Sequence, residues 1–569
     1  MSLRRSKVVE ASKTLPGGQT SGSGGHRGIA KAAGIMSALT LASRVAGLAR
    51  DIVVGGVFGA SPAADAFFVA FRIPNLFRRV VAEGAASSAF VPVFTSELAR
   101  GGPPAAAEAA RVVGVAAVVW LTVVVAVGMA CSDWVIAVFA PGFTTDPAKR
   151  ALTVELTQLT FPYLLLVGMA AWAMGVLNTF RRFAAASFGP VMLNLAIIAA
   201  VLGLSGRLEQ PVHALVIGVL AGGFLQFAVQ WPSLRAVGVS IGGVRGVFRH
   251  PAVRRVGRLL VPTIVGGAIY QINILVATIF ASLLPGQSVS YLWYADRVFE
   301  FPLGVVAVAI GAAALPTLSG QAAVGRHDEM AHSVAYSLRL VWAVCLPATL
   351  GLWMLAPQIV EVLFERGRFT HGDVEMTAWA LRAYVFGLLS VAAVRVLVSV
   401  FYAFEEAKVP VRTACAAFVA NVLTDLALMG PTDPNAGWWG AKWVATAGDW
   451  LRIADLRHAG LALGTGVAAT VNALLLYLLA RRRLPGLQGR ALARAFLLHS
   501  AATAAMGAVL WGWSLAGGRW LTPAARAWWD VCGGVPVAMG AYVLAALWLE
   551  SEEISDIVRG LRRRFFPAR

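Results

Sequence analysis

Residues 43–94 of the chain read SRVAGLARDIVVGGVFGASPAADAFFVAFRIPNLFRRVVAEGAASSAFVPVF, an apolar stretch interrupted by eight charges. These charges are Arg44, Arg50, Asp51, Asp65, Arg72, Arg78, Arg79 and Glu83. An ionised side chain inside a bilayer costs about 2.5–3.5 kcal/mol on insertion scales, so it persists where it faces a water-filled cavity or a charged ligand. The stretch therefore predicts a membrane transporter.

The composition of the whole chain is that of a membrane protein. Of its 569 residues, 58% are hydrophobic and 14% are charged, whereas charged residues make up about a quarter of an ordinary soluble domain. A helix crosses the hydrocarbon core in about 20 residues, and apolar stretches of that length recur along the chain. We expect an all-α polytopic protein with fourteen transmembrane helices, at residues 35–59, 66–99, 112–140, 152–178, 187–206, 212–234, 259–284, 290–319, 334–357, 374–403, 412–430, 460–480, 495–516 and 528–549.

The basic residues predict which side of the membrane each loop occupies, because cytoplasmic loops carry the excess of Lys and Arg. They precede helix 1, follow helices 2, 4, 6, 8, 10 and 12, and fill the C-terminal tail. The opposite loops, such as 141–150 and 284–289, contain few of them. We therefore expect an even number of crossings and both termini in the cytoplasm.

The net charge of +19 fits this topology and the anionic headgroups of a membrane, so we do not expect a nucleic-acid partner. The four cysteines, Cys131, Cys345, Cys415 and Cys532, lie within or beside apolar helices and have no C-x-x-C spacing. They predict neither a disulfide framework nor a zinc site.

Composition divides the chain into five segments. We expect a disordered basic tail at 1–33, an N-terminal lobe of helices 1–6 at 34–236, a C-terminal lobe of helices 7–12 at 237–484, helices 13–14 at 485–549, and a basic tail at 550–569. The C-terminal lobe includes one sizeable outer loop, 431–459, which carries Trp438, Trp439, Trp443 and Trp450. Tryptophan is enriched at membrane–water interfaces, so this loop is predicted to lie there.

A short pattern occurs twice, six helices apart. The chain reads AFRIP from Ala70 to Pro74 and ADRVFEFP from Ala295 to Pro302, and a further proline follows each copy at nearly equal distance. Copies six helices apart cross the membrane in the same direction, so the pattern predicts two parallel six-helix halves with a substrate between them. The alternative is chance similarity in apolar sequence.

The charges on helix 1 predict an ionic face. Arg44 and Asp51 are seven residues apart and share nearly one side of a helix, and Arg50 lies about a quarter-turn away. Helix 2 brings Arg78, and helix 8 brings Arg297 between two carboxylates. A guanidinium forms paired, charge-assisted bonds with phosphate oxygens, so these residues favour a diphosphate ligand. The alternative is that the arginines only pair with neighbouring carboxylates or extend to the interface.

A second candidate site lies on helix 11, where Asn421 and Asp425 stack on one helical face. Their oxygens could hold Na⁺ or a proton, and the alternative is a polar pair that bonds between helices. Neither a G-x-x-x-x-G-K-[ST] phosphate loop nor an H-E-x-x-H motif occurs. We therefore expect a transporter rather than an enzyme, without a cofactor or a firm metal site.

The segment from Ser43 to Phe94 closely resembles the start of the MurJ (MviN) lipid II flippases. Three more blocks resemble the same family: LNTFRRFAAASFGPVMLN from Leu177, YADRVFEFPLGV from Tyr294 and FYAFEEAKVPV from Phe401. The resemblance covers roughly residues 34–515. It implies a fourteen-helix member of the multidrug/oligosaccharidyl-lipid/polysaccharide (MOP) exporter superfamily, with two six-helix lobes around a cationic cavity and two further helices that form a groove for a lipid tail.

The resemblance also implies a set of site residues. The cavity arginines of the family fall on Arg44, Arg50, Arg78 and Arg297, with Asp51 beside them and Ser290 on a cavity-lining position. Sodium ligands of some members fall on Asn421, Asp425 and Thr465. The carboxylate expected on helix 7 falls on Ala277, and a site with one carboxylate should hold a cation less firmly. Coupling could instead rest on the membrane potential, worth about 2.3 kcal/mol per charge at 100 mV.

The resulting expectation is a monomeric flippase in the bacterial inner membrane, which moves undecaprenyl-diphosphate-linked peptidoglycan precursor to the outer leaflet for cell wall synthesis. Its partners would be lipid II, membrane lipids and peptidoglycan-synthesis proteins. Two alternatives stay open: a flippase for another polyprenyl-linked glycan, and a non-transporting membrane scaffold for envelope synthesis.

Overall fold

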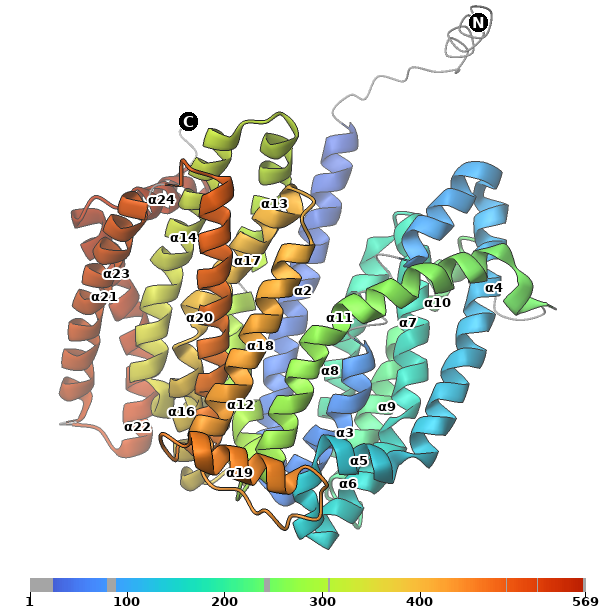
Figure 1. The fold of residues 1–569 in the computed structure, drawn as a ribbon, viewed down its shortest axis with the longest axis horizontal. Helices are drawn as coiled ribbons and strands as arrows, with labels where there is room; N and C mark the ends of the chain where they lie inside the picture. Colours follow the sequence, from blue (N-terminus) through green and yellow to red (C-terminus); the bar gives the residue numbers. More distant parts are fainter. Residues whose placement is uncertain are drawn as a thin grey trace, which may run out of the picture.

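The computed structural model describes residues 24–78, 89–239, 246–304, 308–487, 489–518 and 520–565, and within these ranges the protein is built of helices (Figure 1). One isolated β-bridge joins Met429 and Asp455. The helices are α2 (Gly24–Phe58), α3 (Pro62–Arg78), α4 (Val91–Ala130), α5 (Ser132–Phe139), α6 (Pro147–Thr160), α7 (Pro162–Thr179), α8 (Phe183–Leu204), α9 (His213–Ala228), α10 (Trp231–Arg235), α11 (Pro251–Leu283), α12 (Ser288–Pro302), α13 (Val308–Ala323), α14 (His327–Met354), α15 (Ala356–Phe364), α16 (His371–Val385), α17 (Leu388–Ala403), α18 (Lys408–Leu428), α19 (Ala441–Leu451), α20 (Arg457–Arg483), α21 (Gly489–Gly518), α22 (Pro523–Trp528), α23 (Val535–Trp548) and α24 (Glu552–Phe565).

The predicted all-α membrane fold is confirmed. Among the described residues, nine helices or joined helices are long and apolar enough to cross a bilayer, and a tenth results if α16 and α17, bent by 41°, form one span. The other expected crossings coincide with α2, α3, α11 and the α12–α13 pair, whose charges or undescribed residues keep them below that threshold. The count of fourteen is therefore consistent with the structure.

Breaks in several helices follow from local sequence. Helix α4 is interrupted at Gly102, which adopts φ 71° and is followed by two prolines. Proline lacks the backbone N–H that a helix interior needs, and at Pro162 it separates α6 from α7. The predicted crossing at 152–178 is thus assembled from α6 and α7, and that at 374–403 from α16 and α17.

Two groups of helices stand side by side in Figure 1, with α2 between them. One group contains α3, α4 and α6–α9, and the other contains α12–α18 and α20. Helix α2 packs along α8, while α11 contacts α4 in the first group and α18 and α20 in the second. Helices α21 and α23 pack on each other and on α14, at the outer edge of the second group. The start of α2 and helix α24 lie at the same end of the molecule (Figure 1).

At the end opposite the termini, the two groups are joined by buried polar contacts. Asp65 on α3 is 1% exposed. Its carboxylate forms an ion pair with Lys149 Nζ on α6 at a distance of 2.7 Å. The same carboxylate accepts hydrogen bonds from the backbone N–H and hydroxyl of Ser290 on α12. The Tyr294 hydroxyl, also on α12, donates to the Gly59 carbonyl at 3.2 Å. These contacts hold α3 against α12 and α6 against α3.

The C-terminal segment, expected as a basic tail, contains the docked helix α24. Glu553 is buried at its start and lies 3.0 Å from Arg339 Nε on α14 and 3.3 Å from His499 Nε2 on α21. Burial by itself raises the pKa of the Glu553 carboxyl, but hydrogen bonds from His499, the backbone and Ser551, with the charge of Arg339, lower the pKa to about 2. The charged form of Glu553 therefore favours docking of α24.

Acidification should release α24. The Glu553 carboxyl has a pKa of 4.5 without these partners and about 2 with them, so its contribution to docking is complete above pH 4.5 and is lost as the pH falls towards 2. Hydrogen exchange of the α24 amides, corrected for intrinsic rates, should increase across that interval. The increase in exchange should be absent in Glu553→Gln, in which the docking of α24 is already weakened at neutral pH. It should be retained in the control variant Glu552→Gln, which alters an exposed carboxylate. The same acid response in Glu553→Gln would contradict the assignment.

Removing Lys149 should destabilise the joined end. A buried carboxylate without its cationic partner costs about 3 kcal/mol or more, and Lys149→Met leaves Asp65 with Ser290 alone. Thermal unfolding in detergent should show a lower midpoint for Lys149→Met, a smaller loss for Lys149→Arg, and no change for the exposed control Lys442→Met. Equal midpoints for Lys149→Met and the wild type would mean that this ion pair does not stabilise the joined end.

Candidate functional site

A cavity lies between the two groups of helices, and residues of both line it. Its walls come from α3, α11, α12, α16, α18 and α20. The lining residues are Arg72, Asn75, Leu76, Gln271, Asn273, Ile274, Ala277, Leu292, Trp293, Asp296, Arg297, Glu300, Tyr384, Asn421, Leu461 and Thr465. Helices α3 and α12, which carry Arg72 and Arg297, therefore face one common space with the predicted cation-binding helices α18 and α20, whereas α2 contributes no lining residue.

A shared carboxylate connects α2 to α12 beside this cavity. Asp51 is 3% exposed, and its Oδ1 accepts hydrogen bonds from Arg50 Nε at 3.0 Å and Nη2 at 2.7 Å. Its other oxygen, Oδ2, lies 3.6 Å from Arg297 Nε. Arg50 also donates from Nη1 to Asn194 Oδ1 on α8 at 3.1 Å. Asp51 thus pairs with arginines from two parts of the fold, and Arg297 also pairs with Glu300 of its own helix at 3.2 Å.

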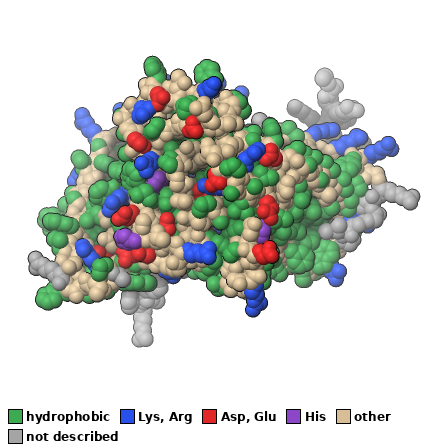
Figure 2. Space-filling view, turned by 90° about the horizontal axis from the view of Figure 1, so that it is seen from below, with side chains coloured by type: hydrophobic (Ala, Val, Ile, Leu, Met, Phe, Trp, Pro, Cys, Tyr) green, Lys and Arg blue, Asp and Glu red, His purple; other side chains and the backbone are tan. Residues whose placement is uncertain are grey.

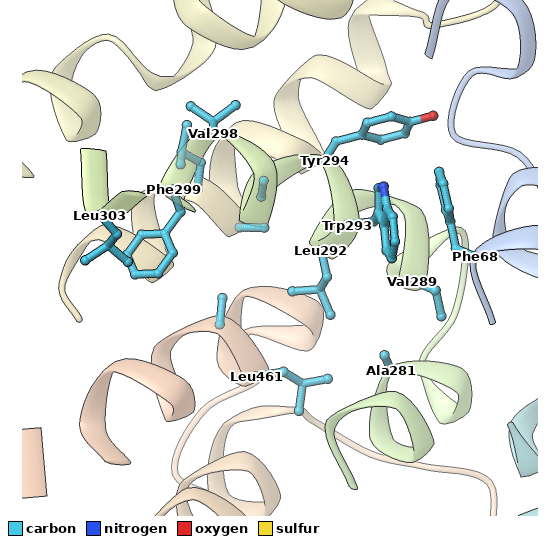
Figure 3. Packing of buried hydrophobic residues seen from close by; sticks show 14 of the residues in the cluster. Phe68, Ala281, Val289, Leu292, Trp293, Tyr294, Val298, Phe299, Leu303 and Leu461 are labelled. Carbon is cyan, nitrogen blue, oxygen red and sulfur yellow. The ribbon is translucent and has the colours of Figure 1, made fainter. Parts of the chain in front are cut away.

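Trp293 holds two arginines on its indole ring. The guanidinium carbon of Arg297 lies 4.5 Å from the ring centroid, and that of Arg72 lies 5.6 Å from it. Phe68 stacks on Trp293 with centroids 4.6 Å apart (Figure 3). Arg72 also donates from Nη1 to Thr278 Oγ1 on α11 at 2.7 Å. The corresponding arginines of the predicted repeat, Arg72 and Arg297, therefore lie against the same aromatic side chain.

Arg44 and Arg78, which were predicted to face the cavity, are not among the residues that line it. The Arg44 guanidinium packs against Gly304, where a larger side chain would meet it. Arg78 donates from Nε to Asn75 Oδ1 at 2.7 Å, and Asn75 lines the cavity. Arg79 and Glu83, which the sequence also singles out, lie outside the described residues.

Ser290 lies away from the cavity lining. Its side chain is fully buried, and both its backbone N–H and its hydroxyl are directed to Asp65. Sequence reasoning placed this serine on the wall of the cavity, whereas the hydroxyl belongs to the joined end of the molecule. We therefore do not assign Ser290 a direct contact with a ligand.

The predicted cation group is close-packed. Asn421 and Asp425 are 2% and 1% exposed, and Asn421 Nδ2 donates to Asp425 Oδ1 at 3.0 Å. Thr465 Oγ1 donates to the Leu461 carbonyl one turn earlier at 3.2 Å. Ala277, at the position where a carboxylate was expected, lines the same cavity as Asn421 and Thr465. Within the described part of the chain, no group of three or more His, Cys, Asp or Glu side chains could hold a metal ion.

Sequence reasoning missed Trp293 and Thr278, the lining amides Asn75, Gln271 and Asn273, and Lys149 at the joined end. An aromatic residue in an apolar helix, such as Trp293, gives no local sign of the cations that it will meet. Lys149 lies in a loop that was noted for its few basic residues, and Thr278 lies between Ala277 and Ile279. The signal for each comes from a distant residue, so spacing along the chain could not reveal it.

The arrangement suits an anionic ligand. Arg72 and Arg297 line the space together with the carboxylates of Asp296 and Glu300, and Arg50 is connected to Arg297 through Asp51. Guanidinium groups stay protonated in proteins, and their planar fork matches two phosphate oxygens at once. The amide side chains of Asn75, Gln271 and Asn273 add neutral donors and acceptors. The cavity can therefore bind a phosphate group beside a polar, uncharged one.

Comparison with known proteins agrees with this chemistry. A family model described as "Lipid II flippase MurJ" matches residues 54–436. The probable lipid II flippase MurJ of Vibrio cholerae is 39% identical over 451 residues, which cover 78% of this chain and 81% of that protein. The lipid II flippase MurJ of Burkholderia cenocepacia is 36% identical over 456 residues, 79% of this chain and 83% of that protein.

Solved structures show the same fold. Lipid II flippase MurJ in an inward closed conformation has a TM-score of 0.71 at 23% identity, over 92% of this chain and 99% of that one. An inward-facing multidrug resistance MATE family transporter of the MOP superfamily has a TM-score of 0.58 at 14% identity, over 78% and 95% of the two chains. Since the family model matches more than half of the chain, and relatives over 30% identical align with most of it, this multi-pass membrane protein belongs to the MurJ lipid II flippase family.

Proposed function

We propose that the chain moves lipid II, the undecaprenyl-diphosphate-linked peptidoglycan precursor, from the cytoplasmic to the outer leaflet of the bacterial inner membrane. Family membership supports the substrate. The observation that carries the proposal is the group of Arg50, Asp51 and Arg297, which connects α2 to α12 beside a cavity lined by both groups of helices. Movement across a bilayer breaks no covalent bond, so no residue is assigned a catalytic role.

The diphosphate would compete with Asp51 for the arginines. Asp51 pairs with Arg50 and Arg297, and Glu300 also pairs with Arg297 at 3.2 Å, so a phosphate group would have to displace carboxylate oxygens from these guanidinium groups. A diphosphate offers more oxygens than a carboxylate, and the guanidinium groups can bind them in pairs. Because Arg50, Arg72 and Arg297 come from α2, α3 and α12, a ligand that binds all three would change the contacts between the two groups of helices. Binding is thereby coupled to the relative position of the groups, as alternating access requires.

The remaining parts of lipid II fit other regions of the fold. We place the sugar and peptide beside Asn75, Gln271 and Asn273 in the cavity. The lipid tail would lie along α21 and α23, the apolar pair at the edge of the molecule. The termini would face the cytoplasm, so that the end joined by Asp65 and Lys149 faces outward. A monomer provides all of these parts. Flipping of another polyprenyl-linked glycan would use the same arginines, whereas a scaffold would not need them.

Loss of Arg50 should abolish transport. Charge-assisted hydrogen bonds contribute about 1.5–3 kcal/mol each, so Arg50→Ala should lower the flipping rate about tenfold or more. In cells depleted of the native protein, the fraction of lipid II exposed on the outer leaflet should recover with the wild type and fail to recover with Arg50→Ala at equal expression. Arg326→Ala, which removes an exposed loop arginine, is the matched control and should restore exposure.

Three other outcomes of this rescue would change the conclusion. Full rescue by Arg50→Ala would contradict the proposed diphosphate site. If depletion leaves lipid II exposure unchanged and redundancy is excluded, lipid II is not the substrate. If Arg50→Ala then supports normal growth, the scaffold alternative is favoured.

Sodium should not stabilise the wild type, because Ala277 supplies no carboxylate beside Asn421 and Thr465. We propose that the membrane potential drives transport. Ala277→Asp should create a site with two carboxylates, the introduced one and that of Asp425, and Na⁺ in place of K⁺ should then raise the thermal unfolding midpoint of this variant. Ala277→Asn, with similar volume and no charge, should not respond. A sodium-dependent midpoint in the wild type would instead favour sodium coupling.

A further inference from the structure

The segment 431–456 exposes an unusual amount of aromatic surface. Trp439, Trp443 and Trp450 are 84%, 78% and 86% exposed, and Ile453 is 82% exposed. Large side chains of this kind are normally at least half covered in water-soluble regions. Four of them lie within 15 consecutive residues of one segment that contains the short helix α19. This surface takes no part in the cavity described above.

The residues of α19 are sorted onto three faces. Ala441, Ala445 and Gly448 are buried and face the bundle, where α19 packs on α18. Trp443 and Trp450, seven residues apart, share the side of the helix opposite these small residues. A third strip, between the other two, carries exposed Lys442, Thr446 and Asp449. The helix thus presents small residues to the protein, tryptophans away from it, and a polar strip to one side.

The segment is held firmly in this orientation. At its base, Ile453 N–H donates to the Ala427 carbonyl at 2.9 Å and Leu456 N–H to the Leu428 carbonyl at 2.8 Å. At its tip, the Thr144 hydroxyl on the short helix η2 (Pro141–Thr145) donates to the Ala436 carbonyl. The tryptophans therefore cannot turn inward without breaking contacts at both ends.

The position of α19 decides what lies against the tryptophans. Figure 1 shows α19 running across the axes of α18 and α11, at the end of the bundle opposite the termini and in front of it. Figure 2, viewed onto that end, shows apolar and charged side chains intermixed over the surface. Since α18 and α20 are membrane-spanning helices, the side of α19 directed away from the bundle points sideways at the level where these spans end.

We propose that α19 is an interfacial helix whose tryptophan face binds the headgroup and upper acyl region of the lipid leaflet at this end of the molecule. Tryptophan favours this level because its ring is apolar while its N–H can reach water or headgroups. The adjacent strip of Lys442, Thr446 and Asp449 then faces the aqueous phase, as in helices that lie in the membrane plane. The proposed orientation of the termini makes this the outer leaflet. The inference is independent of the transported substrate.

Site-directed spin labelling in lipid nanodiscs tests the proposal. The native cysteines are first replaced in the full-length chain, and single cysteines are introduced at Trp443, Trp450, Lys442 and Asp449, all exposed positions at which a label leaves packing intact. A label at buried Ala445 is avoided for that reason. Collision rates with O₂, which concentrates in lipid, and with a water-soluble nickel chelate are measured at each site.

Labels at 443 and 450 should collide at least threefold more often with O₂ relative to the nickel chelate than labels at 442 and 449. Equal ratios at all four positions, with ready access to nickel, would overturn the proposal and assign the tryptophan face to a water-borne partner. Protection of 443 and 450 from both reagents would also overturn it, since the face would then be covered by protein. A second copy of the chain is distinguished by repeating the measurement in nanodiscs that hold one molecule.

Discussion

The ion pairs of Asp51 set the geometry of the cavity. This carboxylate is nearly inaccessible to water and meets Arg50 of its own helix and Arg297 of α12. Without it, two guanidinium groups would face each other in a region of low dielectric, where like charges repel strongly. With it, the arginines stay close enough to act on one ligand. The positions of α2, α8 and α12 follow, because Asn194 ties Arg50 to α8.

Aromatic packing complements this charge balance. Trp293 stacks on Phe68 of α3 and carries Arg297 and Arg72 against its ring, so an uncharged side chain orients both arginines. A carboxylate in the place of Trp293 would compete with an anionic ligand, whereas a π face attracts a cation without supplying a competing charge. Arg297 is consequently held both by carboxylates and by an aromatic ring. That combination lets binding energy act on helix positions rather than on ordering side chains.

The ion pairs at the joined end play a different role. Asp65 is satisfied by Lys149 and by both donors of Ser290, and it links three helices from the two groups. Buried ion pairs contribute modestly to net stability, because desolvation offsets their attraction, but they are costly to leave half-paired. Such a contact favours one of two arrangements: fully made or fully separated and hydrated. This behaviour suits a contact that has to open during a transport cycle.

Three features could be predicted from the sequence: the all-α membrane fold, most of the apolar spans, and an ionic group on the first two helices. These are local properties, since hydropathy over about 20 residues and the sign of a charge do not depend on distant partners. Arg50, Asp51, Arg297, Asn421 and Asp425 could be named as candidates for the same reason. The tertiary structure alone decided the partners. In the folded chain Asp51 pairs with Arg297, and Ser290 donates to Asp65 instead of lining the cavity. The ring of Trp293 lies against two arginines. The tertiary structure also turned two segments expected as a loop and a tail into α19 and α24. Partners hundreds of residues apart meet only when helices pack. A single sequence, considered by itself, contains no record of which helix faces will be in contact.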